Sequence, residues 1–211
     1  VINLTNKLNS LGREPKEDDA LALASWGSWD KEQNRFVFPV MQNIDMTDGT
    51  ASRRDCTIDQ FYGIIEGNGY YINGLDISGP GFIGTVKNGA KVNNLELRNV
   101  TVDNGTSADG TGALAGKVEA GGTIHNCSAT GVSAVKGGAN TGGLIGQGSP
   151  AMDRCSSNAQ VISSGDNTGG LIGNLEAPGS IKQSYTTGSV EAGGNNAGGL
   201  VGNASGTITD S

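Results

Sequence analysis

The sequence predicts an all-β fold, a right-handed parallel β-solenoid (β-helix) preceded by a short helical cap. Three observations lead to this prediction. Glycine is abundant, with 36 copies among 211 residues; a glycine-rich phrase recurs along the chain; and its copies are spaced by about 27 to 31 residues, a period typical of solenoids. A repeat of this length cannot bury a core alone, so the copies are expected to stack.

The recurring phrase is Gly-Gly-Leu-Ile-Gly with its variants, and its copies begin near residues 81, 112, 142, 169 and 198. The leucine holds the same place in four copies, which predicts a column of core side chains: Leu114, Leu144, Leu171 and Leu200. An asparagine stands just before three of the glycine pairs and predicts a ladder of stacked amides: Asn140, Asn167 and Asn196. A disordered Gly/Ser/Asn tail is the alternative, but disorder would not keep leucine in register over the copies.

A second block places a corner in every coil. Its first and fourth positions are both apolar or small, and a flat strand cannot turn both inward because side chains alternate between its faces. We expect a tight corner at the third position, where Gly74, Asn94 and Asn126 tolerate a left-handed backbone. The copies are residues 72–75, 92–95, 124–127, 152–155, 181–184 and 208–211. A third short apolar stretch closes each turn, at residues 100–102, 132–135, 160–162 and 189–191.

Residues 1–60 are expected to cap the solenoid that residues 61–211 form. Within the cap, residues 17–26 predict a short helix with acidic residues at its positive end, and residues 36–41 predict a strand. Residues 61–72 predict the first coil. The sequence stops at Ser211 in the middle of a coil, so the solenoid is expected to continue beyond residue 211 in a longer protein.

Charge, hydropathy and cysteine content argue against several classes of function. A formal net charge of −7 and a pI near 4.6, without a basic stripe, argue against a nucleic-acid partner. No apolar run is long enough to span a membrane, and no signal peptide begins the sequence, so an exported protein would have lost its signal.

Three widely spaced cysteines and one histidine offer no zinc or redox motif. No cofactor is implied, and the glycine-rich calcium-binding repeat pattern is absent.

Asp76 and Glu96 are the strongest candidates for a catalytic pair. Each follows the corner leucine of its block, so both are expected to face outward, about one strand spacing apart. Polysaccharide-cleaving β-helices use such outward acids to bind calcium or to act as acid and base. The same column continues with Ser128, Ser156 and Tyr185, which leaves an acidic spot and favours a solvated pair partly neutralised by Arg98.

Three further features favour structural roles. His125 and Asp153 stack outward in neighbouring coils without a nucleophile, which favours a surface hydrogen bond over general-base catalysis. Cys127 and Cys155 share one inward column, where two buried free thiols are favoured over a disulfide. Residues 66–69 lack the lysine and hydroxyl residue of a phosphate-binding loop and predict a tight corner.

Several segments together resemble the GLUG-motif repeat proteins of bacterial surfaces: residues 42–46, residues 61–69 and the Gly-Gly-Leu-Ile-Gly copies. The resemblance covers about residues 36 to 211, although residues 80–84 depart from the double glycine in the first copy. That family is known from adhesin-like proteins and as an accessory repeat in some immunoglobulin A peptidases. Membership would imply a secreted or surface-attached solenoid, with no catalytic residues to carry over.

The predicted function is that of a non-catalytic adhesin-like or structural repeat module, part of a larger secreted or cell-surface bacterial protein, that binds glycan or protein ligands. The outward columns hold serine, threonine, asparagine and glycine with isolated charges, and a rigid stack offers a long binding face. The alternative is a β-helix polysaccharide lyase or glycoside hydrolase that uses Asp76 and Glu96.

Overall fold

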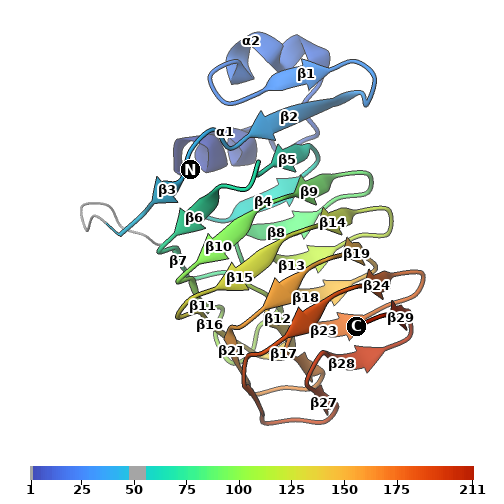
Figure 1. Cartoon of the computed structure of the whole chain (residues 1–211). Helices are drawn as coiled ribbons and strands as arrows, with labels where there is room; N and C mark the ends of the chain where they lie inside the picture. The colour runs from blue at the N-terminus through green and yellow to red at the C-terminus, as the bar shows by residue number, and fades with distance from the viewer. Residues whose placement is uncertain (1, 48–55) are drawn as a thin grey trace.

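The computed structural model describes residues 2–47 and 56–211, and it is a right-handed parallel β-solenoid of about six turns (Figure 1). This confirms the predicted fold class. Each complete coil passes through five sheets, named A, B, D, E and C in the order in which the chain meets them. The strand pairs of the described residues are parallel, apart from the antiparallel pair of β1 and β2.

The strands are short, between two and five residues. Sheet A contains β1 (Ser28–Asp30), β2 (Arg35–Pro39), β5 (Ile64–Glu66), β9 (Lys91–Asn93), β14 (Thr123–His125), β19 (Ala151–Asp153), β24 (Ser180–Lys182) and β29 (Thr207–Thr209). Sheet B contains β3 (Ile44–Asp45), β6 (Tyr71–Asn73), β10 (Glu96–Arg98), β15 (Ser128–Thr130), β20 (Ser156–Ser157) and β25 (Tyr185–Thr186). Sheet D contains β7 (Asp76–Ile77), β11 (Thr101–Asp103), β16 (Ala134–Gly137), β21 (Gln160–Ser163) and β26 (Val190–Ala192). Sheet E contains β12 (Asp109–Thr111), β17 (Ala139–Gly142), β22 (Thr168–Gly169) and β27 (Ala197–Gly198). Sheet C contains β4 (Ile58–Phe61), β8 (Ile83–Val86), β13 (Ala115–Val118), β18 (Ile145–Gly148), β23 (Ile172–Leu175) and β28 (Val201–Ala204).

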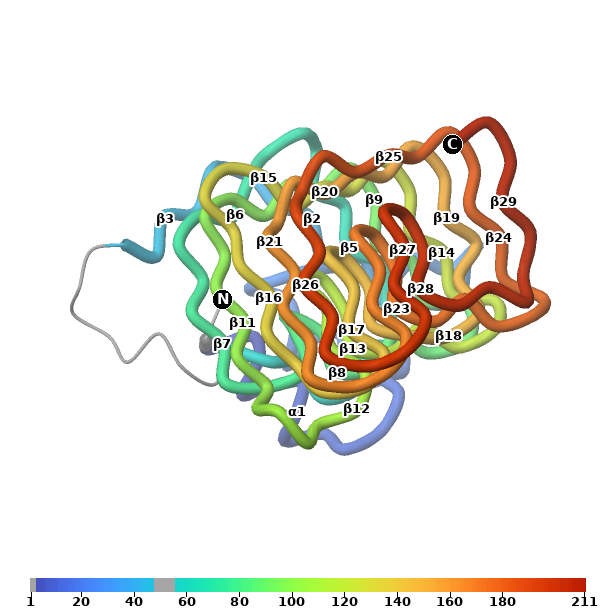
Figure 2. The backbone as a smooth tube through the Cα atoms, turned by 90° about the horizontal axis from the view of Figure 1, so that it is seen from below, coloured from blue at the N-terminus to red at the C-terminus, as the bar shows by residue number. Residues whose placement is uncertain are grey.

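The recurring glycine phrase makes the chain double back between sheets E and C, as Figure 2 shows for β27 and β28. The two sheets touch backbone to backbone at the last glycine of the phrase. A Cβ added at Gly146 would lie 2.4 Å from the Thr111 nitrogen, and one added at Gly173 would lie 2.5 Å from the Asn140 carbonyl carbon. Any side chain at these places would hold the sheets apart, which explains why the phrase ends in glycine.

The leucine of the phrase projects into the core. Leu114, Leu144 and Leu171 are buried, whereas Leu200, in the last coil of the chain, is only partly buried. The Leu114 N–H donates to the Leu144 carbonyl at 2.9 Å, the Leu144 N–H to the Leu171 carbonyl at 2.9 Å, and the Leu171 N–H to the Leu200 carbonyl at 2.9 Å. The structure therefore stacks the four leucines coil on coil.

The corner between sheets A and B adopts the left-handed conformation in successive coils. Its residues are Asn94 (φ 54°), Asn126 (φ 49°), Arg154 (φ 53°), Gln183 (φ 48°) and Asp210 (φ 54°). A left-handed backbone is sterically unfavourable for arginine and glutamine, and much less so for asparagine and glycine. The stacking of the strands on either side therefore imposes this conformation on the corner. Gly74, predicted for this corner, lies instead at the next one, where its N–H donates to the Arg98 carbonyl at 2.9 Å.

The predicted alignment of the first coil was therefore wrong. Ile72 pairs with Leu97 and not with Val92, whose partner is Ile65. The cause is the A–B corner of this coil, which runs from residue 67 to residue 70, whereas only residues 94 and 95 separate β9 from β10. The longer corner does not carry the four-residue pattern of residues 92–95, and the pattern was matched to the next corner, between β6 and β7.

The cap consists of helix α1 (Ile2–Leu11), the 3₁₀ turn η1 (Glu17–Asp19), helix α2 (Ala20–Leu23) and the pair β1–β2. The η1 and α2 segments lie within the predicted helix of residues 17–26, while α1 was not predicted. The in-register parallel pairing reaches back to β2, whose Val37 pairs with Ile64. The coils thus begin upstream of the predicted boundary at residue 61, which falls at the end of β4.

Candidate functional site

Asp76 and Glu96 do not form the predicted pair. Asp76 in sheet D pairs with Thr101, and Glu96 in sheet B pairs with Tyr71 on one side and Ser128 on the other. The misaligned first coil caused the error, because Tyr71 takes the place expected for Asp76. The remainder of the predicted column is correct, since Ser128 pairs with Ser156 and Ser156 with Tyr185.

Glu96 is already engaged by its neighbours. Its two carboxylate oxygens accept hydrogen bonds from Nε and Nη2 of Arg98 at 2.8 Å each, and Oε1 accepts a third from the Thr130 hydroxyl. The Arg98 hydrogen bonds hold the pKa of Glu96 below its ordinary value, although partial burial acts in the opposite direction. The Arg98 guanidinium also stacks 3.9 Å from the centre of the Tyr71 ring. A carboxylate held ionised in this way is a poor general acid.

This arrangement predicts that Arg98→Ala raises the pKa of Glu96. The pKa of Glu96 in the folded protein lies below its value in the unfolded chain, about 4.3, so the Arg98–Glu96 interaction stabilises the fold above about pH 4.3. This stabilisation is lost as the pH falls through the folded-state pKa of Glu96. Carboxyl chemical-shift titration of both proteins measures the change. A Glu96 pKa that stays the same in Arg98→Ala would contradict the assignment.

His125, Asp153 and Arg154 form a compact cluster on the outer side of sheet A. Asp153 Oδ2 lies 3.2 Å from His125 Nδ1 and 3.2 Å from Arg154 Nε, and Arg154 Nη2 lies 3.0 Å from His125 Nε2. Because an arginine nitrogen only donates, it requires His125 Nε2 as acceptor and leaves Nδ1–H to donate to Asp153. In the described chain, the side chains of His125, Asp153 and Arg154 hydrogen-bond to one another and to no serine, threonine or cysteine side chain. His125 and Asp153 therefore hold the Arg154 side chain in place.

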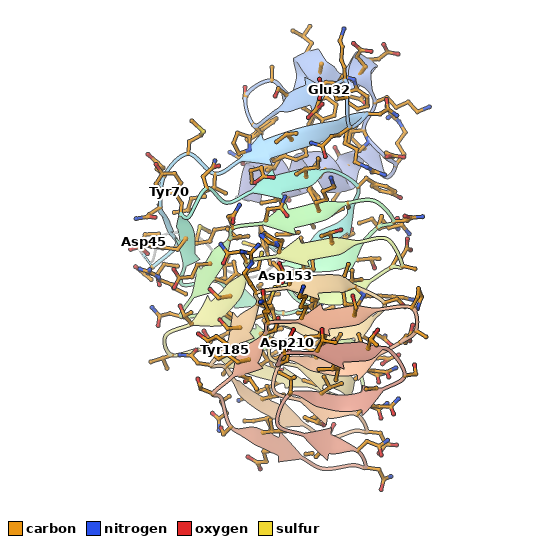
Figure 3. The ribbon with its side chains drawn as sticks, turned by 45° about the vertical axis from the view of Figure 1, so that its right-hand side comes forward. Glu32, Asp45, Tyr70, Asp153, Tyr185 and Asp210 are labelled. Carbon is orange, nitrogen blue, oxygen red and sulfur yellow. The ribbon has the colours of Figure 1, made fainter. Side chains whose placement is uncertain are left out.

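Arg154 forms part of a cavity of about 300 Å³ at the corner between sheets A and B, here called the corner groove. It is lined by Asn126, Ser128, Arg154, Ser156, Gln183 and Tyr185, with Cys127 beneath. Tyr185 is 62% exposed, and its stacked neighbours in sheet B, Ser156 and Ser128, are small. One face of the groove is therefore an aromatic ring beside a row of hydroxyls and amides. Figure 3 shows Tyr185 and Asp153 on the same face of the stack.

The thiols beneath the groove are buried and free. Cys127 and Cys155 are at most 1% exposed and lie in one inward column. Burial raises the pKa of the Cys127 thiol, and it raises that of Cys155 to about 11. Both sulfurs approach backbone carbonyls, Cys127 that of Val92 at 3.4 Å and Cys155 that of Ile124 at 3.5 Å. Protonated buried thiols serve as small apolar core groups.

The three asparagines of the predicted ladder stand one above another. Asn196 Nδ2 donates to Asn167 Oδ1 at 2.8 Å, Asn167 Nδ2 donates to Asn140 Oδ1 at 2.8 Å, and Asn140 Nδ2 donates to Asp109 Oδ1 at 2.6 Å. All three have a left-handed backbone, with φ between 53° and 61°. Their amides satisfy one another along the stack, so the structure places them as supporting elements of the coils.

Within residues 2–47 and 56–211, no group of three or more histidine, cysteine, aspartate or glutamate side chains could hold a metal ion. No helix in that part of the chain is long and apolar enough to cross a membrane.

The repeat pattern predicts the column that contains Tyr185, but it does not predict the groove. The sequence predicts only that Arg154 stands at a corner. Its contact with His125 in the preceding coil depends on the left-handed backbone at Arg154, which sets the direction of the side chain. One sequence signal could have indicated the groove: in the outward column, the large aromatic Tyr185 follows the two small residues Ser128 and Ser156.

No protein-family model matches the chain, and no curated protein matches it. Among solved structures, a Bacteroides ovatus protein described as a "putative immunoglobulin A1 protease" matches with a TM-score of 0.57 and 16% sequence identity, covering 83% of this chain and 67% of that one. At this identity the likeness shows the fold alone. Fold and site together define the class as a parallel β-solenoid repeat protein with a polar surface groove.

Proposed function

We propose that this chain is a non-catalytic repeat module of a secreted or cell-surface bacterial protein, and that it binds glycan in the corner groove. The observation that carries the proposal is the exposed ring of Tyr185 beside the hydroxyls of Ser128 and Ser156 and the amides of Asn126 and Gln183. An aromatic face packs against the C–H groups of a sugar ring, while hydroxyls and amides both donate and accept hydrogen bonds with its hydroxyls.

The fixed arginine adds to this argument. Two nitrogens of the Arg154 guanidinium are held by Asp153 and His125, at 3.2 and 3.0 Å, so this residue of the groove lining has little conformational entropy left to lose on binding. A positioned guanidinium favours a sugar that carries a carboxylate. The resemblance to GLUG-motif repeats, which remains a prediction, agrees with a role at a bacterial surface.

The test is a glycan array with neutral and acidic saccharides, followed by titration calorimetry with the saccharide that binds best. Tyr185→Ala is expected to weaken that binding by about tenfold or more, because it removes the central aromatic contact. Tyr70→Ala is the matched control: Tyr70 is also a surface tyrosine, 38% exposed, but it lies nearer the N-terminal end of the stack (Figure 3). Equal affinity in wild type and Tyr185→Ala, or equal losses in both variants, would refute the corner groove as the binding site.

A further inference from the structure

The lining of the corner groove is uncharged except for one side chain. Among the described residues that line it, Arg154 is the only one that carries a charge, and the others offer amides, hydroxyls, the Tyr185 ring and a thiol. The Cys127 thiol stays protonated, because burial raises its pKa. A groove with a single cation and no carboxylate in its lining stands out in a chain whose formal net charge is −7.

Two carboxylates flank the groove, and each is bound by an arginine. Glu96, the Cα partner of Ser128, is held by Arg98 at 2.8 Å. Asp153 lies 3.2 Å from Arg154 Nε, and its Cα partner in the next coil is a second cation, Lys182. Neither carboxylate is therefore an unscreened negative charge that would repel an anionic ligand from the groove.

One end of the Arg154 guanidinium is left for a ligand. A guanidinium has five N–H donors; Nε uses its one on Asp153, and Nη2 uses one of its two on His125. No recorded hydrogen bond or ion pair joins Nη1 to a described residue, and 58% of the side chain is exposed. The second N–H of Nη2 and those of Nη1 can thus meet the two oxygens of a carboxylate.

The aromatic ring and the guanidinium border the same small cavity. Ser156 follows Arg154 by two residues and pairs with Tyr185 in the next coil, and all three line the groove. Its volume of about 300 Å³ is at the lower end of ligand-binding pockets. One sugar unit of a longer chain can therefore lie against the Tyr185 ring and present a substituent to Arg154.

We infer that the corner groove selects saccharides that carry a carboxylate group, such as a uronic or sialic acid unit, and that Arg154 is the residue that determines this specificity. The inference rests on the proposed function, since it names the class of glycan that the same groove binds. Tyr185 supplies the contact that neutral and acidic sugars share, and Arg154 supplies the contact that only the acidic ones make.

The test compares matched saccharides by titration calorimetry. Trigalacturonate is compared with its methyl ester, and 3′-sialyllactose with lactose and 3′-sulfolactose, so that the uronic, sialic and sulfated sources of negative charge are separated. In at least one pair the carboxylate form is expected to bind about three- to tenfold tighter than the neutral form, between the effects of an exposed ion pair and of a charged hydrogen bond. The difference is expected to shrink as salt is added.

Arg154→Gln is expected to abolish the preference for the carboxylate form while neutral binding remains. The variant is expected to fold, because Gln183 occupies the same corner one coil later with a similar left-handed backbone, φ 48° against 53°. Lys182→Gln is the matched control: it removes the same charge from a neighbouring exposed residue outside the groove lining, and it is expected to keep the preference. Tyr185→Ala is expected to weaken both members of each pair by the same factor.

The outcomes separate this inference from the proposed function. Equal affinity for the acidic and neutral forms, a preference that survives in Arg154→Gln or disappears equally in Lys182→Gln, or tighter binding of the sulfated sugar than of both carboxylate sugars would overturn the carboxylate specificity and leave glycan binding intact. Absence of binding by every saccharide, or binding that Tyr185→Ala does not weaken, would overturn the proposed function and the inference with it.

Discussion

Leu171→Asp is expected to unfold several coils of the solenoid. The Leu171 side chain is fully buried, and its backbone bonds to the coils on both sides, accepting from Leu144 and donating to Leu200. The substitution removes apolar contacts and buries a carboxylate without a partner, a loss on the order of 5 kcal/mol or more in the free energy of unfolding. Because each coil is stabilised by its neighbours, the damage spreads along the stack.

Circular dichroism during thermal and urea unfolding measures this effect. Ile208→Asp is the control, since Ile208 occupies a strand of the last coil and is 40% exposed; it should change the midpoint far less. A Leu171→Asp protein that melts cooperatively at the wild-type temperature would contradict a core built on the leucine column.

The second large effect is expected for Gly170→Ala. A Cβ at Gly170 would lie 2.1 Å from the Gly199 carbonyl oxygen in the next coil, closer than any real contact. The coils must move apart to admit it, which costs about 1–3 kcal/mol, the usual range for overpacking. The melting temperature should fall by several degrees.

Gly199→Ala tests the same position of the phrase one coil later. No atom lies within 4 Å of a Cβ built there, and an added methyl without strain stabilises slightly by reducing the freedom of the unfolded chain. The two variants therefore separate a steric effect of coil stacking from a general effect of replacing glycine. Equal melting temperatures for the two variants would show that the coils do not touch at the glycine phrase.

The repeat made most of the fold predictable. Side chains at identical places of a stacked repeat must lie in columns, so the glycine phrase placed Leu144 over Leu171 and the corner block aligned Ser128 with Ser156. What the repeat could not show was the length of each corner. The residues inserted between β5 and β6 have no counterpart in the next coil, and a pattern matched on Ile72 and Leu75 alone fits two sheets equally well.

The cap and the sites were harder to predict for a different physical reason. Helix α1 carries no acidic residue in its first turn and no basic residue in its last, so its ends lack the charge signals that favour a helix. The corner groove is formed by residues from three coils, so it leaves no contiguous motif in the sequence.

The proposed function joins these features into one account: a rigid stack presents Tyr185 and Arg154 on a fixed corner, and the chain binds its ligand there without transforming it. The most direct test incubates the protein with the saccharide selected on the array, with and without calcium, and examines the saccharide by mass spectrometry after binding has been verified by calorimetry. The account predicts saturable binding that depends on Tyr185 and complete recovery of the intact saccharide. Time-dependent appearance of shorter or unsaturated products, lost in an Asp76→Asn or Glu96→Gln variant, would contradict it and establish a polysaccharide-degrading enzyme.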